Sequence, residues 1–359
     1  MMKIVLLASY YKSYLDNFAQ NYSLDELDYQ QHREKLLDDY FGAFVSYRNY
    51  FCERGHDCEL LIDNDFSLQQ KWLNEHHINM IATPKTKRKV VMKQLEVLEP
   101  DVLFVGSMFE YYGDFLRQVQ SQITPNIFTW IACPFPANLD FQPVKCVLTS
   151  VPEFLSGLSV PVEKLAAAFD ADIVKMMGDV KKSIDVSFAG SLSSSHRYRK
   201  QSLEALCAEQ IPLAIFGNIE KRRFLSWWGK EPLMDIAKPA VWGLNMYRTL
   251  AASRITLNFH IDVARNANFV GNMRMYEATG CGAMLLTDYQ DGIESLFIPD
   301  KEIVTFRSID ELKEKVTYYL KHEEECRRIA EAGQKACFER HGYDRRIVAF
   351  EEIFMKYVE

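Results

Sequence analysis

The sequence predicts an α/β protein built from two doubly wound domains. Short apolar runs typical of buried strands alternate with helical patterns along most of its 359 residues, and roughly 100–200 residues per domain suggests two domains. The alternation stops between Ser156 and Lys182, where glycine, proline and charged residues mix. We therefore expect a first domain at 1–165, a linker at 166–183, a second domain at 184–342, and a last helix at 343–359 that crosses back to the first domain.

In the first domain, apolar runs predict six strands, at 3–8, 58–62, 79–83, 101–106, 126–132 and 145–149. Apolar residues at helical spacing from Leu37 to Phe51, followed by Gly55, predict one amphipathic helix. A second helix is expected at 87–99, where Pro100 ends it. Strands that alternate with helices at this pace form parallel sheets with helices on both faces.

The second domain repeats this pattern. Strands are expected at 184–191, 213–217, 255–260, 283–287 and 303–306, and helices at 197–209, 241–252, 322–340 and 343–358, with one more helix that bears Leu312, Val316, Tyr319 and Leu320. Ser308 with Glu311 is a capping box at the start of one of these helices. Doubly wound domains bind ligands beyond the carboxyl ends of their strands, where the strand order reverses.

Composition and charge argue against several classes of protein. A net charge of −7 gives no support for nucleic acid or an anionic membrane as a partner. We expect no transmembrane segment and no signal peptide, because the chain lacks a run of ~18–20 apolar residues and its first apolar run is short. The eight cysteines form no CxxC pair and have no histidine at metal-ligand spacing, so we expect a cytoplasmic protein without a metal site.

The stretch from Asn272 to Asp288, NMRMYEATGCGAMLLTD, reads as a helix that leads into a buried strand. Asn272 can cap the helix, Gly280 can end it, and Arg274 and Glu277 share one face. Backbone N–H groups at a helix start attract anions, and a glutamate one turn in can accept two hydrogen bonds from a vicinal diol. A ribose that carries a diphosphate offers both features. The alternative is an Arg274–Glu277 ion pair on a solvated helix face.

Four pieces in order extend this pattern: DVSFAGS, YRTLAASRITLNFH, NMRMYEATGCGAMLLTD and the tail from DELKEKV to HGYDRR. With them, residues 185–346 resemble the group-1 glycosyltransferases, in the branch of the CgeB-like spore-maturation proteins. The resemblance implies the GT-B fold, in which two Rossmann-like domains face an interdomain cleft and the second domain holds a nucleotide-sugar donor. The first half of the chain matches in its general βα rhythm.

The resemblance also implies roles for individual residues. Glu277 matches the ribose-binding glutamate of the family, and Asn272 and Arg274 match the Asn-x-Arg that faces the phosphates of the donor. Gly190 and Ser191 match a glycine turn where backbone can approach a diphosphate closely. We therefore expect these five residues to bind the donor, with Arg274 also acting in catalysis.

More cations follow that glycine turn. Arg197, Arg199 and Lys200 begin a helix, where they can neutralise the leaving diphosphate; the alternative is a solvated basic face. Retaining members of the wider group often carry a second glutamate where this chain has Phe269. Retention of anomeric configuration is thus in doubt.

The contact to the donor sugar must come from elsewhere. It is expected from the polar loop after His260, which offers Asp262, Arg265, Asn266 and Asn268.

An inverting reaction needs a general base, which we expect on the first domain. Glu110 and Asp114 follow a predicted strand and are the first candidates, with His56 and His260 as further options. Each has a structural alternative. The two carboxylates can cap the next helix, and His260 can be a satisfied residue at a strand end.

The resemblance implies a glycosyltransferase of the hexosyltransferase type, which we expect to be metal-independent. It would move a sugar from a nucleotide-diphosphate donor, with no separate cofactor, to an unidentified sugar, protein or small-molecule acceptor. One alternative is a nucleotide-sugar 2-epimerase of the same fold. The other is a catalytically degenerate binding protein, which the phenylalanine at position 269 keeps open.

Overall fold

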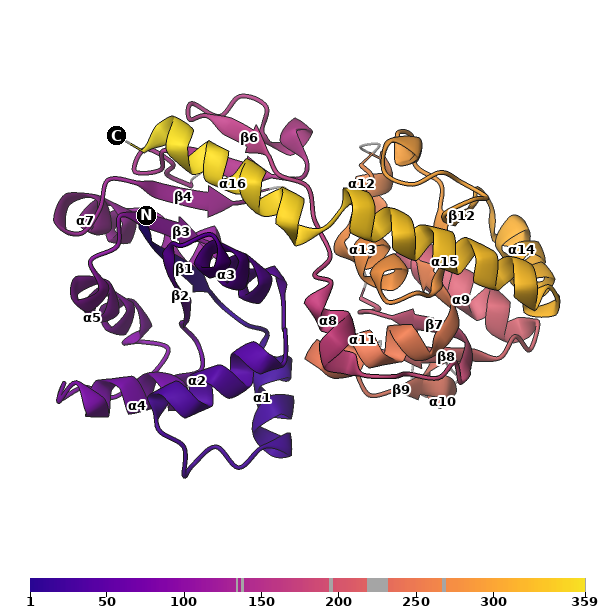
Figure 1. Ribbon diagram of the computed structural model, residues 1–359, viewed down its shortest axis with the longest axis horizontal. Helices are drawn as coiled ribbons and strands as arrows, with labels where there is room; N and C mark the ends of the chain where they lie inside the picture. The colour runs from indigo at the N-terminus through magenta and orange to yellow at the C-terminus, as the bar shows by residue number, and fades with distance from the viewer. Residues whose placement is uncertain (134, 137–138, 194–195, 218–231, 267–268, 359) are drawn as a thin grey trace. The chain divides into compact units, whose positions relative to one another are not determined.

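The structure is a computed structural model that describes residues 1–133, 135–136, 139–193, 196–217, 232–266 and 269–358. The chain divides into two compact units, unit 1 with Met1–Ala166 and Tyr343–Glu359 and unit 2 with Ala167–Gly342 (Figure 1). Each unit contains a six-stranded sheet in which every neighbouring pair of strands is parallel. The predicted α/β class with two doubly wound domains is confirmed.

The sheet of unit 1 has the order β2-β1-β3-β4-β5-β6. Its strands are β1 (Lys3–Ala8), β2 (Asp57–Ile62), β3 (Val102–Val105), β4 (Ile127–Trp130), β5 (Cys146–Thr149) and β6 (Val162–Lys164). Its helices are α1 (Lys12–Asn21), α2 (Tyr29–Asp38), α3 (Ala43–Glu53), α4 (Phe66–Glu75), α5 (Lys87–Leu98), α6 (Met108–Tyr111), α7 (Asp114–Gln122) and α16 (Tyr343–Tyr357), with a 3-10 turn at Pro152–Leu155. The strand order reverses between β1 and β3, which defines the switch point of this sheet.

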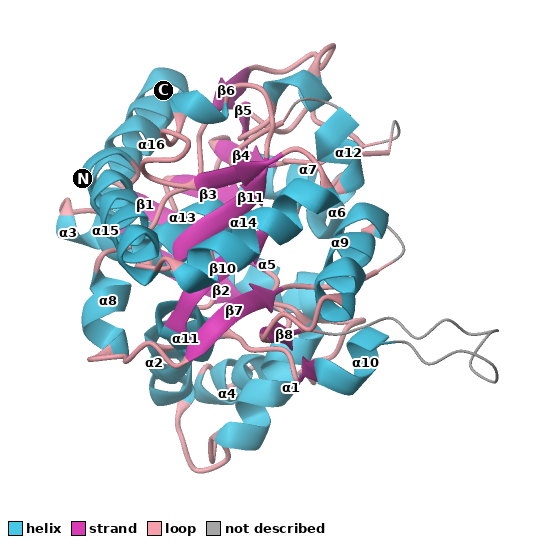
Figure 2. Cartoon of the chain, turned by 90° about the vertical axis from the view of Figure 1, so that its right-hand side faces the viewer, coloured by secondary structure: helices cyan, strands magenta, loops and turns pink. Residues whose placement is uncertain are grey.

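The sheet of unit 2 has the order β12-β11-β10-β7-β8-β9, and Figure 2 shows β7, β10 and β11 with helices around them. Its strands are β7 (Ile184–Ala189), β8 (Leu213–Phe216), β9 (Ala237–Lys238), β10 (Ser253–Asn258), β11 (Met284–Asp288) and β12 (Val304–Phe306). Its helices are α8 (Asp172–Met177), α9 (Arg197–Ala208), α10 (Pro232–Ile236), α11 (Gly243–Ala252), α12 (Asp262–Asn266), α13 (Met273–Gly280), α14 (Ile309–Lys321) and α15 (Glu323–Arg340), with a 3-10 turn at Ile293–Ser295. The switch point of this sheet lies between β7 and β10.

The last helix of the chain completes the core of unit 1. In α16, Phe350 lies 5.0 Å from Phe104 of β3 and 5.3 Å from Phe51 of α3, measured between ring centroids. Phe354 lies 4.6 Å from Phe128 of β4. All five rings are buried, so residues at the end of the sequence cover a sheet formed near its beginning.

Two predictions about unit 1 are wrong in detail. The expected helix from Leu37 to Phe51 is two helices, because Tyr40 (φ 51°) and Gly42 (φ 80°) adopt left-handed backbone that a helix cannot accommodate.

The expected strand at 79–83 is not formed. Side chains satisfy part of its backbone, since Gln70 Oε1 accepts from Ala82 N at 2.9 Å and Thr86 Oγ1 donates to Ile81 O at 2.6 Å. A backbone engaged in this way does not need a neighbouring strand.

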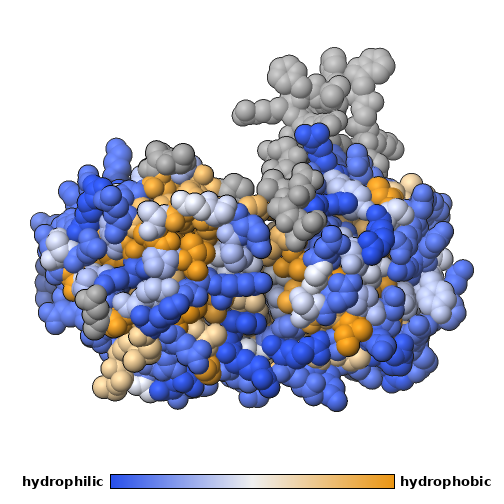
Figure 3. All heavy atoms as spheres, turned by 90° about the horizontal axis from the view of Figure 1, so that it is seen from above, coloured by the Kyte–Doolittle hydropathy of each residue, from blue (hydrophilic) through white to orange (hydrophobic). Residues whose placement is uncertain are grey.

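The surface drawn in Figure 3 is mainly hydrophilic, with hydrophobic residues gathered in places. Within the described ranges, no helix is both long and apolar enough to cross a membrane.

Candidate functional site

Helix α13 carries an acid–base pair near the carboxyl edge of the second sheet. Arg274 Nη1 lies 2.8 Å from Glu277 Oε2, and their side chains are 18% and 12% exposed. The ion pair anticipated as the alternative interpretation is therefore present, but its face is largely buried. A carboxylate held this way has a fixed position, and its second oxygen, Oε1, is available for another donor.

Asn272 occupies the N-cap position of α13, but its side chain makes no capping hydrogen bond. Its Nδ2 instead donates to Asn258 Oδ1 at 3.1 Å, and Asn258 Nδ2 donates to Thr287 Oγ1 at 2.9 Å. The predicted side-chain cap is wrong for this reason. The amide chain ties the start of α13 to the ends of β10 and β11 and leaves the first N–H groups of the helix without a side-chain acceptor from Asn272.

Gly280 and Gly282 shape the other end of α13. The helix runs to Gly280, and Gly282 (φ 72°) ends it with a left-handed residue while Ala283 N donates to Ala278 O at 3.0 Å. Gly280 has a separate role, because an added Cβ there would lie 2.3 Å from the ring of Phe169.

Gly190 and Ser191 form the turn after β7. Gly190 N donates to Phe216 O at 2.9 Å, and a Cβ added to Gly217 would lie 1.9 Å from Gly190 O. The ends of β7 and β8 therefore approach more closely than a side chain would allow.

Arg199 of α9 spans the switch point of the sheet. Its Nη1 donates to Ser191 O at 2.8 Å, after β7, and its Nη2 donates to Phe259 O at 2.9 Å, after β10. Arg199 thus lies against the turn formed by Gly190 and Ser191, and the donor-binding roles of these residues stay predictions. A fixed guanidinium lies where doubly wound sheets bind their ligands.

A second polar group lies at the ends of β10 and β11. Asp288 Oδ1 accepts from His260 N at 2.9 Å and lies 2.8 Å from His260 Nδ1, while Arg265 Nε lies 3.8 Å from Asp288 Oδ2. The guanidinium carbon of Arg265 also lies 3.4 Å from the ring centroid of Tyr198. Asp288 therefore fixes both a histidine and an arginine at the edge that Arg199 spans.

The charged groups at this edge of the sheet affect the pKa of Arg199. Burial lowers the pKa of Arg199 to about 10; the Asp288 carboxylate opposes this shift, and the positive charge of Arg274 adds to it. Arg199 Nε, Arg265 Nη1 and His260 Nε2 are buried and have no hydrogen-bond partner among the described residues. Buried donors of this kind suit an anionic or polyhydroxylated ligand.

The remaining predicted residues of unit 2 contribute less to this geometry. The side chain of Arg197 is exposed, and its backbone N donates to Asp262 Oδ2 at 3.2 Å. Asn268 lies outside the described residues, and Phe269 is half-buried.

Unit 1 holds the predicted general bases. Glu110 is 55% exposed in its side chain and lies 2.9 Å from Lys87 Nζ, while Asp114 is fully exposed and lies 3.4 Å from Arg117. His56 Nε2 lies 2.8 Å from Glu351 Oε1 of α16. The catalytic roles of Glu110 and Asp114 stay predictions.

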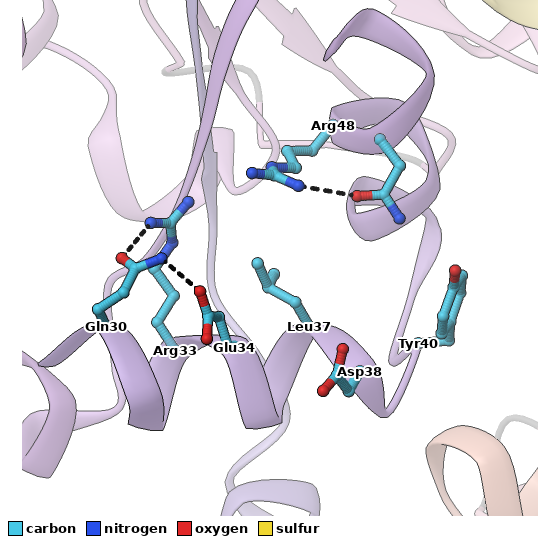
Figure 4. A pocket seen from close by; sticks show the side chains of 8 residues that line it. Gln30, Arg33, Glu34, Leu37, Asp38, Tyr40 and Arg48 are labelled. Carbon is cyan, nitrogen blue, oxygen red and sulfur yellow. Dashed lines mark hydrogen bonds between the residues drawn. The ribbon is translucent and has the colours of Figure 1, made fainter. Parts of the chain in front are cut away.

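A cavity of about 150 Å³ lies between α2 and α3, and Figure 4 shows the side chains that line it. Its two guanidiniums already have partners: Arg33 bonds to Gln30 Oε1 at 3.0 Å and to Glu59, and Arg48 bonds to Asn49 Oδ1 at 3.1 Å. We assign no function to it.

The sequence analysis named His260 and Arg265 as candidate site residues but did not predict their contacts. It did not identify Asp288 or Asn258 as site residues. Asp288 directly follows a buried apolar run, and an aspartate at the carboxyl end of a strand was the signal that could have found it. In the described part of the chain, no three histidine, cysteine, aspartate or glutamate residues are grouped so that they could hold a metal ion.

Comparisons with known proteins agree with this architecture. Residues 197–352 match a family model described as glycosyl transferase-like. The structure resembles Anabaena HepE, solved with UDP and glucose, with a TM-score of 0.61 and 12% identity over 99% of this chain and 100% of the other.

Two further structures are similar over nearly their whole lengths. Sucrose-phosphate synthase from Thermosynechococcus elongatus has a TM-score of 0.57 and 9% identity, over 99% of both chains. AviGT4, a glycosyltransferase of avilamycin A biosynthesis, has a TM-score of 0.59 and 13% identity, over 100% of this chain and 98% of the other.

The fold is GT-B. At these identities, the likeness to solved structures establishes the fold alone. The family match supports the resemblance to group-1 glycosyltransferases, while the CgeB-like branch stays a prediction. A search of curated proteins gives no match. In this GT-B chain, Arg199 spans the switch point of the second sheet, and His260, Arg265 and Asp288 lie at the ends of β10 and β11.

Proposed function

We propose that this protein is a glycosyltransferase that takes a sugar from a nucleoside diphosphate. The observation that carries the proposal is the switch point of unit 2, where Arg199 joins the turns after β7 and β10. The family match over 197–352 and the GT-B fold add support, because both belong to proteins of this class.

The proposed roles follow from the contacts. Glu277, held by Arg274, accepts hydrogen bonds from the ribose diol. The N–H groups at the start of α13 and the guanidiniums of Arg199 and Arg274 hold the diphosphate. Because these groups are fixed before the reaction, they stabilise the negative charge that develops on the leaving group. This proposal needs no metal ion or separate cofactor.

A uridine nucleotide is the first donor to test, because the Anabaena relative was solved with UDP and with UDP-glucose. We also propose the finer assignments made from sequence: a hexosyl donor, the CgeB-like branch and a cytoplasmic location. The acceptor remains to be identified as a sugar, a protein or a small molecule.

A thermal-shift and calorimetric screen with UDP, GDP, CDP, TDP and their sugars tests this proposal. We expect one nucleoside diphosphate to raise the melting temperature, and incubation of its sugar with an acceptor panel to release that diphosphate. Two outcomes contradict a transferase. A new sugar nucleotide formed from donor alone indicates an epimerase, and failure to bind any nucleotide indicates a degenerate binding protein.

A further inference from the structure

Unit 1 contains a groove that the proposed function does not use. The groove has a volume of about 860 Å³ and is lined by α1, by the loop at 22–28 and by the loop that joins β2 to α4. Helices α1, α2 and α4 lie together at one end of unit 1 (Figures 1 and 2). The lining residues all belong to unit 1, so this one unit forms the whole groove, and its size is that of a small-molecule site.

The loop after β2 is fixed by hydrogen bonds to the loop after β1. Tyr10 N donates to Asn64 Oδ1 at 2.8 Å, and Asn64 Nδ2 donates to Tyr10 O at 2.7 Å. The neighbouring Asp63 is buried, and its Oδ2 accepts from Ser9 Oγ at 2.8 Å and from Tyr111 OH at 2.5 Å. This side of the groove is therefore formed before any ligand binds.

The loop at 22–28 is fixed by a lysine of α4. Lys71 Nζ donates to Leu24 O at 2.7 Å and also bonds to Leu27 O. The ring of Tyr22, at the start of the loop, lies 4.6 Å from the ring of Phe18 between centroids. Leu24 is buried, so the loop places an apolar side chain at the bottom of the groove and its polar side chains at the rim.

Asp65 is a buried carboxylate that lines the groove. The residue is 9% exposed, and its Oδ1 caps α4 by accepting from Leu68 N at 3.0 Å. Its Oδ2 lies 3.2 Å from His32 Nε2, but that nitrogen makes no hydrogen bond within the described part of the chain. Oδ2 therefore receives no hydrogen bond from a described residue. A carboxylate oxygen of this kind suits an N–H or O–H donor of a ligand.

The groove carries an excess of negative charge. Its charged lining residues are four carboxylates and one cation, namely Asp16, Asp25, Glu26, Asp65 and Lys12. The cation is already paired, because Lys12 Nζ donates to Asp16 Oδ1 at 2.7 Å. Asp25 and Glu26 are exposed, and neither forms an ion pair with a residue that the structure describes. Charge complementarity therefore favours a cationic ligand.

Apolar and aromatic side chains form much of the remaining surface. Tyr22 is 43% exposed, and Leu15 and Phe66 are half-buried. Aromatic faces attract cations, and Lys35 Nζ already lies 5.6 Å from the ring centroid of Tyr22. The groove thus suits a ligand with both a compact ring body and positively charged donors.

We propose that this groove binds an amino sugar or a short oligosaccharide that contains one. The ammonium group pairs with the carboxylates, the hydroxyls donate to carboxylate oxygens, and the sugar rings cover the apolar side chains. A neutral sugar leaves the negative charge unbalanced, and a flexible amine without rings leaves the apolar surface exposed. The proposal goes beyond the proposed function, because it requires neither a donor nor a transfer step.

Calorimetric titration of the full chain with three probes tests the proposal. The probes are the β-1,4-linked disaccharide of glucosamine, cellobiose and cadaverine, at about pH 6, where amines of this kind are protonated. The two sugars share a skeleton and differ in an ammonium or a hydroxyl group at C2, while cadaverine has two ammonium groups and no ring. We expect the glucosamine disaccharide to bind about tenfold or more tighter than either other probe, and added salt to weaken its binding.

Two variants locate the binding in the groove. The double variant Asp25→Asn with Glu26→Gln removes two exposed charges, and Asp65→Asn removes the buried one while it keeps a residue that can cap α4. Each should weaken binding of the glucosamine disaccharide about tenfold. Glu53→Gln is the matched control, because Glu53 is exposed on α3 and does not line the groove. It should bind as the parent does.

The contrary outcomes are equally definite. Absence of binding by the glucosamine disaccharide overturns the proposal, as does equal binding of cellobiose or cadaverine. So does parent-like affinity in the double variant, which changes exposed side chains alone and therefore tests the proposal even if Asp65→Asn loses its fold. Because no nucleotide sugar is present, failure of the proposed function leaves this test unaffected.

Discussion

The two sheets of this protein have the same doubly wound topology but opposite chemistry at their switch points. In unit 2, Arg199 bridges the turns after β7 and β10, and Arg265 and Arg274 lie in the surrounding polar edge. In unit 1, two serines bridge β1 and β3, and a buried carboxylate, Asp63, is the centre. The topology determines where a ligand binds, while the side chains at that place determine which charge it carries.

The two polar clusters suit different chemical groups. Cations and helix N–H groups suit an anionic group such as a diphosphate, whereas a buried carboxylate suits a hydrogen-bond donor. The polar cluster around Asp63 and the one around Arg199 can be altered separately by mutation, since the first belongs to unit 1 and the second to unit 2.

The largest effect on stability is expected from Gly217→Ala. Its new Cβ would meet the backbone carbonyl of Gly190 at 1.9 Å, and backbone cannot move aside without disturbing β7. We expect a loss of about 3 kcal/mol or more in the free energy of unfolding, measured by urea denaturation. Gly106→Ala, the counterpart in unit 1, should cost less because its closest contact is the movable ring of Phe44. Equal losses would contradict this account of the two turns.

Replacement of Arg199 by lysine should weaken nucleoside diphosphate binding about tenfold. Lysine keeps the charge but cannot donate from a rigid fork to the carbonyls of Ser191 and Phe259. Calorimetric titration measures the change. Arg327→Lys is the control, since Arg327 is exposed and pairs with Glu324 on α15. An unchanged affinity in Arg199→Lys would remove Arg199 from the donor site.

The carboxylate in unit 1 predicts a pH dependence of stability. Because burial raises the folded-state pKa of Asp63 above its ordinary value of 3.8, the folded state binds more protons than the unfolded state between these two values. The free energy of unfolding should therefore fall as pH rises through that window. The free energy of unfolding of Asp63→Asn does not fall in this way, because asparagine does not titrate. Measured by urea denaturation, the free energy of unfolding of the variant minus that of the parent should therefore increase as the pH rises from about 4. A constant or decreasing difference would contradict a raised pKa.

The smallest effect is expected from Met246→Leu. Met246 Sδ lies 3.2 Å from Arg274 Nη1, and a thioether is a weak acceptor. Because the ion pair with Glu277 remains, binding of the diphosphate should change less than about threefold. A larger loss would show that Met246, and not Glu277, holds Arg274 in place.

The sequence predicted the fold because its strands are buried on both faces and read as apolar runs. Ile184–Ala189 and Met284–Asp288 are strands of this kind, and both were found close to their true limits. Helical spacing alone could not show the break at Tyr40 and Gly42, because the apolar pattern continues across it. Nor could it exclude a strand at 79–83, where the backbone bonds to side chains of Gln70 and Thr86.

The candidate site was predictable where local motifs carried it. Arg274 and Glu277 lie one turn apart, so their pairing follows from helix geometry. Asp288 and Asp63 were missed, because each acquires its role from partners far away in sequence: His260 in one case, and Ser9 and Tyr111 in the other. Sheet order brings these residues together, and a single sequence does not encode that order in any local pattern.

The central claim is that Glu277 binds the ribose of a nucleoside diphosphate. The direct test is calorimetric titration of UDP and 2′,3′-dideoxy-UDP into the parent and into Glu277→Gln, with Glu163→Gln of unit 1 as the control for loss of a paired carboxylate. We expect the parent and the control to bind UDP about tenfold or more tighter than its dideoxy analogue, and Glu277→Gln to bind both with the same reduced affinity. Binding of UDP by Glu277→Gln with the affinity of the parent would contradict the claim.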